Sequence, residues 1–250
     1  MRKTLLIAAA TLAAGVISSQ AQVYSQNIVG YVNTPLPAGF VNIANPLDAT
    51  GASGVNNSIT NVINVFSGSY DGDGLYIWSG SHYAQYTIDS TVATGIADAA
   101  DVNAVTPPII SPGQAIFINN LNASTTLTFV GTVHVGGAGA STNVVGIATN
   151  TIPSNPAFSY VASVIPVAGG ISSVLGLPAD GSLDGCVLYI PNISGGAVHG
   201  FTQVTIDSTV AGGFADAADV NPVPEPLIPV GTGFFFDNLT GSPITWVQSY

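Results

Sequence analysis

The chain contains one stretch of seventeen residues twice. Residues 87–103 read TIDSTVATGIADAADVN and residues 205–221 read TIDSTVAGGFADAADVN. A match of this length indicates an internal duplication, so we expect two copies of one folding unit. The copies keep their carboxylates as well as their apolar residues, which indicates a specific hydrogen-bonded loop or a cation site used twice. Recent local copying of the gene is the competing explanation. The two copies differ only at Thr94/Gly212 and Ile96/Phe214.

Weaker matches extend the duplication over most of the chain. Between its halves, residues 134–142 are small and Gly-rich, a composition typical of a flexible linker. We therefore expect a first repeat over 22–133, the linker, and a second repeat over 143–250, each large enough for its own core. The matched pairs are Asn27–Gly30 with Asn143–Gly146, Pro37 with Pro153, Asp73-Gly74 with Asp184-Gly185, and residues 112–117 with residues 230–235.

Residues 1–21 have the pattern of a secretory signal peptide. Arg2 and Lys3 precede an apolar run over 5–17, and Ser19 and Ala21 are small residues at the −3 and −1 positions of a cleavage site. The apolar run is shorter than the ~20 residues that a helix needs to span a bilayer, which disfavours a membrane anchor. No second long apolar run follows, so we expect a secreted chain with no transmembrane segment after cleavage.

Positive charge is confined to this predicted signal peptide. Arg2 and Lys3 are the only basic residues, whereas the chain has 13 acidic ones. A mature chain without Lys or Arg has no cation to meet phosphates, so we expect no nucleic-acid partner and no attraction to anionic lipid. Charged residues are only 6% of the chain, so its surface must consist largely of uncharged polar groups. Such a surface suits self-assembly or contact with an extracellular glycan or matrix.

Within each repeat the local patterns mostly predict β-strands. The fold class expected is mainly β, with tandem duplicated β-sandwich-like or barrel-like repeats. One short amphipathic helix is expected in each repeat, from the i, i+3, i+4 spacing that starts at Ile59 and again at Ile171. In the first repeat, the expected strands cover residues 28–33 and 40–44, a hairpin of 75–78 with 83–88, and a second hairpin of 114–119 with 125–130.

Three segments together resemble a known group of proteins. They are VYSQNIVGYVN at residues 23–33, PAGFVNIANPL at residues 37–47, and the glycine-led PGQAIF and VGTGFF at 112–117 and 230–235. This combination resembles uncharacterised secreted proteins of bacteria of the Planctomycetes–Verrucomicrobia–Lentisphaerae group. The resemblance implies an exported bacterial protein in the extracellular space, on the outer cell surface or in the periplasm. It implies no activity.

Candidate catalytic groups are few. His82, His134 and His199 fall in predicted loops, outside any catalytic or zinc-binding spacing. Glycoside hydrolysis needs two carboxyl groups that face a sugar, but the single Glu, Glu225, is followed by Pro226 in a Pro-rich segment. The lone Cys186 lies in an apolar run, which indicates a buried thiol. We therefore predict a protein that is not an enzyme.

Oxygen ligands on predicted loops suit calcium, which takes six to eight oxygens. The spacing does not match an EF-hand, and the alternative is that these side chains only form Asx-turns and caps. If a cofactor is present, calcium is therefore the expected one. The candidate ligands are Asp71 and Asp73 in a DGDG sequence, Asp98, Asp101 and Asn103 in the first duplicated stretch, and Asp216, Asp219 and Asn221 in the second.

Aromatic side chains indicate a possible carbohydrate site. Tyr76 and Trp78 lie on one face of a predicted strand, and Tyr83 joins them across the hairpin turn. The alternative, which we favour, is that this face belongs to the hydrophobic core. The second repeat has Pro191 where the first has Trp78.

Together these patterns predict a secreted, non-catalytic extracellular or cell-surface protein with a structural or adhesive role. Its exposed edge strands could support that role. The alternative is a carbohydrate-binding module, with calcium as its expected stabilising ion. A secreted hydrolase is the third interpretation.

Overall fold

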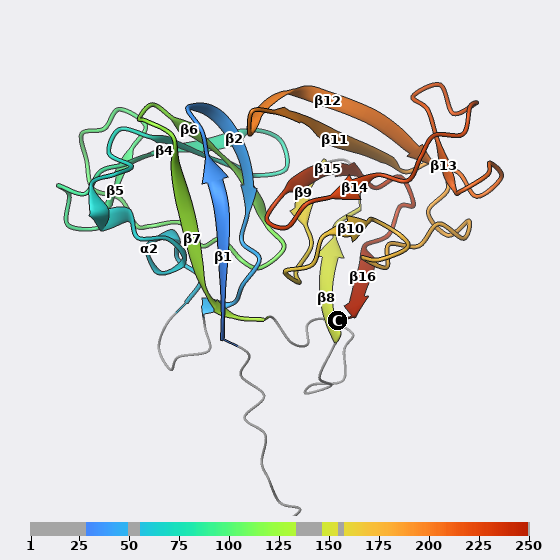
Figure 1. Ribbon diagram of the computed structural model, residues 1–250, viewed down its shortest axis with the longest axis horizontal. Helices are drawn as coiled ribbons and strands as arrows, with labels where there is room; N and C mark the ends of the chain where they lie inside the picture. Colours follow the sequence, from blue (N-terminus) through green and yellow to red (C-terminus); the bar gives the residue numbers. More distant parts are fainter. Residues whose placement is uncertain (1–28, 50–55, 134–146, 155–157, 250) are drawn as a thin grey trace, which may run out of the picture.

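The computed structural model describes residues 29–49, 56–133, 147–154 and 158–249. The predicted signal peptide and linker lie outside these residues. The described chain is mainly β and forms two halves that lie side by side, one for each repeat (Figure 1). The predicted fold class is thereby confirmed, and the sheets within the described ranges are open and antiparallel rather than closed into a barrel.

The first repeat is a five-stranded sheet with a two-stranded ribbon beside it. The sheet has the order β2-β6-β3-β4-β5, and the ribbon pairs β1 with β7. The helix α2 and a short 3-10 turn η2 follow β2. The elements are β1 Val29–Leu36, β2 Gly39–Ala44, α2 Ile59–Val62, η2 Val65–Ser67, β3 Gly74–Trp78, β4 Tyr83–Ile88, β5 Ile96–Asp98, β6 Ala115–Asn120 and β7 Thr125–Thr132.

The second repeat has the same plan. Its sheet has the order β13-β12-β11-β15-β9, its main ribbon pairs β16 with β8, and a short ribbon pairs β10 with β14. The last strand, β16, corresponds to β7, and its residues alternate between buried and exposed. The elements are β8 Ile147–Ile152, β9 Ser159–Ala162, β10 Gly169–Gly170, β11 Val187–Ser194, β12 Ala197–Ile206, β13 Phe214–Ala215, β14 Leu227–Ile228, β15 Gly233–Asp237 and β16 Ile244–Ser249.

Each repeat has a hydrophobic core between its sheet and its ribbon, and Ala148, Val164 and Ile165 of the second repeat join the core of the first. The strands alternate, so one set of side chains meets the core while the next set points away from it. No helix in the described ranges has the length and apolar character needed to cross a bilayer. The fully buried core includes Leu36, Leu75, Ile118 and Leu127 in the first repeat and Ile152, Leu188, Phe236 and Trp246 in the second.

The short helix predicted in both repeats is regular only in the first. There α2 spans Ile59–Val62. In the second repeat, residues 171–175 form hydrogen-bonded turns instead. The Gly170 carbonyl accepts from the backbone N–H groups of both Val174 and Leu175, at 3.1 and 2.9 Å. Hydrogen bonds that span a varying number of residues cannot propagate a helix.

The structure also corrects one match between the repeats. Gly72 and Gly185 make the same backbone hydrogen bond, each donating at 2.9 Å to the last residue of the neighbouring long strand, Ile88 or Ile206. Asp71-Gly72, rather than Asp73-Gly74, therefore corresponds to Asp184-Gly185. Since no insertion separates the copies here, Cys186 occupies the position of Asp73.

The two repeats pack through equivalent edges. The Ala44 N–H on β2 donates to the Gly231 carbonyl, and the equivalent Ala162 N–H on β9 donates to the Gly113 carbonyl, both at 2.8 Å. This reciprocal pattern is that of an approximate two-fold dimer within one chain. It covers the edges β2 and β9, and the opposite edges β5 and β13 are only three and two residues long. Because β13 pairs with only the last two residues of β12, residues 197–204 have no strand partner on the side away from β11 in the described part of the chain. This part of β12 is the kind of edge expected for edge-to-edge adhesion.

Candidate functional site

The face of each large sheet that points away from its own core is aromatic, and the two aromatic faces meet at the junction of the repeats. On β3 and β6, Tyr76 pairs across the strands with Phe117. The same register in the second repeat pairs Tyr189 on β11 with Phe235 on β15. Core residues such as Leu75 and Leu188 occupy the opposite faces. Period-two alternation in both repeats therefore builds one shared aromatic surface.

The structure brings together the three residues predicted to hold a carbohydrate. The ring centroids of Trp78 and Tyr83 lie 4.9 Å apart, and those of Tyr76 and Tyr83 lie 6.5 Å apart. None of the three belongs to the buried core of the first repeat, but Trp78 packs against a small buried cluster at the junction that includes Tyr160. The core interpretation that we favoured therefore applies in part to Trp78, and the carbohydrate interpretation stays a prediction. Trp78 is half-buried because it packs across the junction, 5.8 Å from the Phe235 centroid. Its indole N–H donates to the Phe158 carbonyl.

Three neighbouring cavities that share lining residues lie at this junction, and we call them together the aromatic cleft. The central cavity, of about 350 Å³, is lined by Trp78, Tyr83, Phe158, Tyr189, Phe201 and Phe235. A first-repeat cavity of about 410 Å³ shares Tyr83 with it and continues over Phe40, Tyr76 and Phe117 to Val198. A polar cavity of about 420 Å³ shares Trp78 and Phe158 with it and adds neutral polar residues that include Ser79, Gln114, Asn150 and Thr151.

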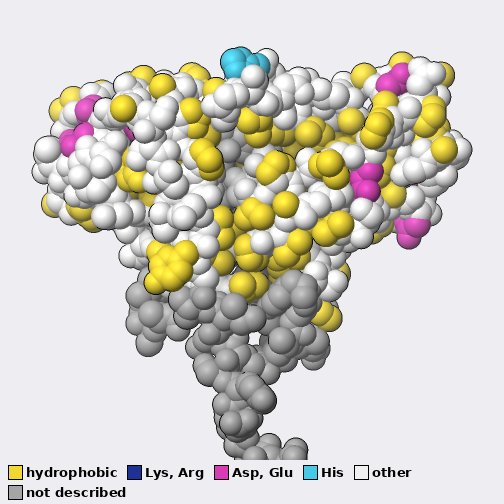
Figure 2. Space-filling view, viewed as in Figure 1, with side chains coloured by type: hydrophobic (Ala, Val, Ile, Leu, Met, Phe, Trp, Pro, Cys, Tyr) yellow, Lys and Arg dark blue, Asp and Glu magenta, His cyan; other side chains and the backbone are white. Residues whose placement is uncertain are grey.

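No charged side chain is among the described residues that line the aromatic cleft. Burial raises the pKa of Tyr83 to about 12, so its hydroxyl is neutral at physiological pH. On the face shown in Figure 2, acidic side chains lie over the two repeats and away from the junction, while hydrophobic side chains gather around it. A buried charge without a partner is costly, so the cleft favours an uncharged ligand.

Tyr160 forms the floor between the two aromatic faces. Its ring stacks on Phe117 and on Phe235, with centroids 5.0 and 4.2 Å apart. It is 5% exposed, and its hydroxyl has no hydrogen-bond partner among the described residues. Burial, together with the negative charge that Tyr83 would carry when ionised, raises the pKa of Tyr160 well above its usual value. A buried unpaired hydroxyl costs stability, which the double stacking offsets.

Sequence reasoning missed the part of the cleft that the second repeat supplies. Phe158, Phe201 and Phe235 lie far along the chain from Trp78, and only the packing of the repeats brings them near it. One available signal was the register match between the repeats, which places Phe235 where the first repeat has Phe117. A further signal was the alternation of aromatic with core residues on both strands.

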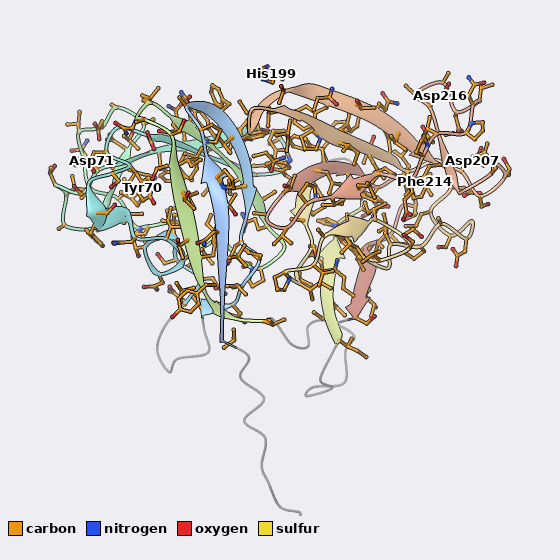
Figure 3. All side chains as sticks on the ribbon, in the orientation of Figure 1. Tyr70, Asp71, His199, Asp207, Phe214 and Asp216 are labelled. Carbon is orange, nitrogen blue, oxygen red and sulfur yellow. The ribbon has the colours of Figure 1, made fainter. Side chains whose placement is uncertain are left out.

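The residues predicted to bind calcium divide between the two outer ends of the molecule, as Figure 3 shows for Asp71 at one end and Asp216 at the other. In the first duplicated loop, Asp98 accepts from the Val102 N–H at 3.0 Å and from the Asn103 amide at 2.7 Å. In the second loop, Asp216 accepts from the Val220 N–H at 3.2 Å and from the Asn221 amide at 2.6 Å. The two copies therefore share one hydrogen-bonded geometry.

Further hydrogen bonds stabilise both duplicated loops. Asp71 accepts from the N–H and the hydroxyl of Ser90, both at 2.7 Å, and Asp184 accepts from Ser208 at 2.8 and 2.7 Å. The hydrogen bonds from Asn103 and Asn221, followed by backbone N–H groups, lower the pKa of Asp98 and Asp216. Asp101 and Asp219 both adopt the left-handed conformation, with φ of 57°, which Asp tolerates better than most residues.

These contacts bear on the calcium prediction without deciding it. Asp71, Asp98 and Asp216 accept hydrogen bonds from their own loops, which agrees with the Asx-turn alternative. No three His, Cys, Asp or Glu side chains gather as a metal-holding group in the described part of the chain. Calcium binding stays a prediction.

Asp73, a further residue predicted to bind calcium, has a buried carboxyl group. It is 0% exposed, and one carboxylate oxygen accepts from the Leu121 N–H at 2.8 Å and from the Asn122 amide at 2.9 Å. The other oxygen has no partner among the described residues. Burial raises the pKa of Asp73, and the hydrogen bonds from Leu121 and Asn122 only partly offset this. The equivalent Cys186 is also buried, and burial raises the pKa of its thiol.

The candidate catalytic groups have local structural contacts. Glu225 accepts from the N–H groups of Ser172 and Ser173 at 2.6 and 2.7 Å, so it holds the turns that follow β10. Partial burial raises its pKa, but the hydrogen bonds outweigh this and the pKa lies below its usual value. The His82 imidazole contacts Ser79 and Ser81 in its hairpin turn. His199, predicted to lie in a loop, is instead on β12, where its imidazole contacts the Ser194 carbonyl on β11. His134 lies outside the described residues.

Comparison of the chain with known proteins and structures identifies no relative. No protein-family model, curated protein or solved structure matches the chain. The resemblance to exported bacterial proteins therefore stays a prediction, and the geometry of the aromatic cleft carries the functional argument.

Proposed function

We propose that this chain is an exported, non-catalytic adhesive protein that binds an uncharged carbohydrate in the aromatic cleft. The observation that carries the proposal is the cleft itself, in which Trp78, Tyr83 and Tyr189 lie together with no charged side chain. Aromatic rings pack well against the C–H faces of sugars. They lose little conformational entropy on binding because their side chains have few rotatable bonds. The signal-peptide pattern of residues 1–21 supports export.

The polar cavity favours a carbohydrate over a purely apolar ligand. The Asn150 amide already donates to the Gly113 and Ala162 carbonyls, both at 3.2 Å. The Gln114 amide N–H groups and the Thr151 hydroxyl remain as neutral polar groups beside the aromatic rings. A lipid chain in this position would leave these groups unpaired, which costs free energy. A sugar has apolar faces for the rings and hydroxyl groups for the amides. The composition of the aromatic cleft therefore matches both sides of a neutral sugar.

The proposal is tested by affinity electrophoresis of residues 22–250 in gels that contain soluble β-glucan, xylan, galactomannan or starch. We expect at least one of these neutral polysaccharides to retard the chain, and anionic alginate to leave it unretarded. Trp78→Ala should abolish the retardation. Tyr31→Ala is the matched control, because Tyr31 is 72% exposed and does not line the cleft.

Tyr189→Ala separates binding from folding, because Trp78 also packs across the junction. Both variants should lose retardation, and melting curves should show that Tyr189→Ala stays folded. If no neutral polysaccharide retards the chain, or if both cleft variants are retarded like the wild type, the carbohydrate proposal is wrong. Self-association of the chain without any polysaccharide would instead support a purely structural role.

A further inference from the structure

The three cavities of the aromatic cleft form a row. Tyr83 lines both the first-repeat cavity and the central cavity. Trp78 and Phe158 line both the central cavity and the polar cavity. Each cavity, at about 350 to 420 Å³, lies at the lower end of the roughly 300–1,000 Å³ typical of small-ligand sites. One sugar ring would occupy at most one cavity and leave its neighbours empty.

Both repeats build this row, so it is incomplete in either one alone. Trp78 from the first repeat donates its indole N–H to the carbonyl of Phe158 from the second. At the far end of the first-repeat cavity, Val198 comes from β12 of the second repeat. A ligand that occupies the row therefore crosses the junction and contacts both halves of the chain.

The chemistry changes along the row. The first-repeat and central cavities are lined by aromatic rings together with Val198. The polar cavity adds hydroxyl and amide groups such as those of Ser79, Gln114 and Asn150. No charged group appears in any of the three among the described lining residues. The row thus suits a chain of similar neutral units, stacked at one end and hydrogen-bonded at the other.

We infer that the aromatic cleft binds a linear, neutral oligosaccharide that spans successive subsites, rather than a single sugar or a chain end. This inference rests on the proposed function. Trp78, together with Phe158, lies between the central and polar subsites, and Tyr83 lies between the central and first-repeat subsites. Tyr76 and Phe40 determine affinity at one end, and Gln114 at the other. Binding also holds the two repeats together.

Calorimetric titration with sugar ladders tests the inference. The probes are cello-, laminari-, xylo-, manno- and malto-oligosaccharides, each from the single sugar to the hexasaccharide. In at least one ladder, affinity should rise about tenfold or more from the disaccharide to the hexasaccharide, since each additional occupied subsite adds stacking or hydrogen bonds. The melting temperature of the chain should rise with the hexasaccharide and little with the single sugar.

Variants at the two ends sharpen the test. Phe40→Ala, at a half-exposed ring of the first-repeat cavity, should weaken hexasaccharide binding about tenfold. Gln114→Ala should weaken it about fivefold. In both variants the ratio of hexasaccharide affinity to disaccharide affinity should fall, and Tyr31→Ala should leave this ratio unchanged. Melting curves establish that each variant is folded.

The failures of the two proposals are distinguishable. If a polysaccharide retards the chain but the disaccharide binds as tightly as the hexasaccharide, the multi-subsite inference is wrong and the carbohydrate site stands. The same holds if the end variants weaken both sugars equally. If no polysaccharide retards the chain and no oligosaccharide releases heat, both proposals fall.

Discussion

The outer ends of the two repeats are nearly identical, whereas their inner faces differ. At the outer ends, Asp98 and Asp216 make the same hydrogen bonds within their loops. Each of these loops contacts its own repeat, so both copies face the same physical constraints. At the inner faces, equivalent positions meet each other around an approximate two-fold axis, so a side chain that fits in one copy need not fit in the other.

Ala115 and Gly233 show this most directly, because they occupy equivalent positions and touch. A Cβ on Gly233 would lie 2.1 Å from the Ala115 Cβ, so both positions cannot carry a methyl group. A second asymmetry adjoins this contact. Asn42 binds both the carbonyl and the N–H of Gly233, at 2.6 and 2.8 Å, whereas the equivalent Tyr160 stacks between two rings. The junction therefore required the copies to diverge.

The largest expected effect comes from making the two copies alike at this contact. Gly233→Ala should lower the free energy of unfolding by about 3 kcal/mol, the upper part of the usual range for overpacking. The double change Gly233→Ala with Ala115→Gly moves the methyl group to the other copy and should restore most of the loss. Urea unfolding measures both. Unchanged stability of Gly233→Ala would contradict the packing of the repeats.

Two equivalent buried asparagines test whether the repeats share their internal construction. Asn120 donates to the Leu36 carbonyl at 2.9 Å and accepts from the Asn122 N–H at 2.8 Å. Asn238 donates to the Pro153 carbonyl at 3.0 Å and accepts from the Thr240 N–H at 3.1 Å.

Replacing either asparagine by Ala leaves buried backbone groups unpaired, which should cost about 2 kcal/mol in each repeat. Urea unfolding of Asn120→Ala and Asn238→Ala compares the two losses, with the exposed Asn192→Ala as control. A clear loss in one repeat only would show that the two asparagines do not have equivalent roles.

A smaller effect distinguishes Asp73 from Cys186. Burial raises the pKa of Asp73, so the folded chain holds this proton more tightly than the unfolded chain. The resulting stability is present at low pH and is lost as the pH rises from the usual Asp pKa of about 4 through the folded value. Asp73→Asn should remove this loss and raise the stability at neutral pH by about 1 kcal/mol, because it supplies a neutral group.

Urea unfolding between pH 3 and pH 8 checks the sign of this effect. Asp73→Cys, which copies the second repeat, should flatten the same part of the pH profile. If the stability of the wild type changes with pH in the same way as that of both variants, the buried acid is contradicted.

The smallest effect is expected at the duplicated loops, where the repeats agree. Hydrogen bonds lower the pKa of Asp98 and Asp216, so their contribution to stability is present above the usual Asp pKa and is lost as the pH falls through the folded value. Asp98→Asn and Asp216→Asn should each reduce the melting temperature slightly and equally, and flatten its fall in acid. Adding EDTA to the wild type tests calcium, since a lower melting temperature would support the predicted site.

Part of the candidate site followed from the sequence because its residues are neighbours on one hairpin. Tyr76, Trp78 and Tyr83 share a face by the two-residue period of strands, and the structure places them together. Phe158 and Phe235 could not be assigned to the same site, since no local pattern places residues of one repeat against those of the other. The same limit applies to Asp73, which looked like a loop residue but is fully buried.

By itself the sequence determined the duplication, the strand-rich character of both repeats and the absence of positive charge beyond Lys3, because these depend on composition and on short periods along the chain. Only the tertiary structure decided which face of each large sheet is core and which is cleft. Both faces carry large apolar side chains. The two-residue period therefore assigns each side chain to one of two faces but does not show which face is accessible to solvent. The packing of one repeat against the other settles that choice, and it forms the aromatic cleft from residues that neither copy could bring together alone.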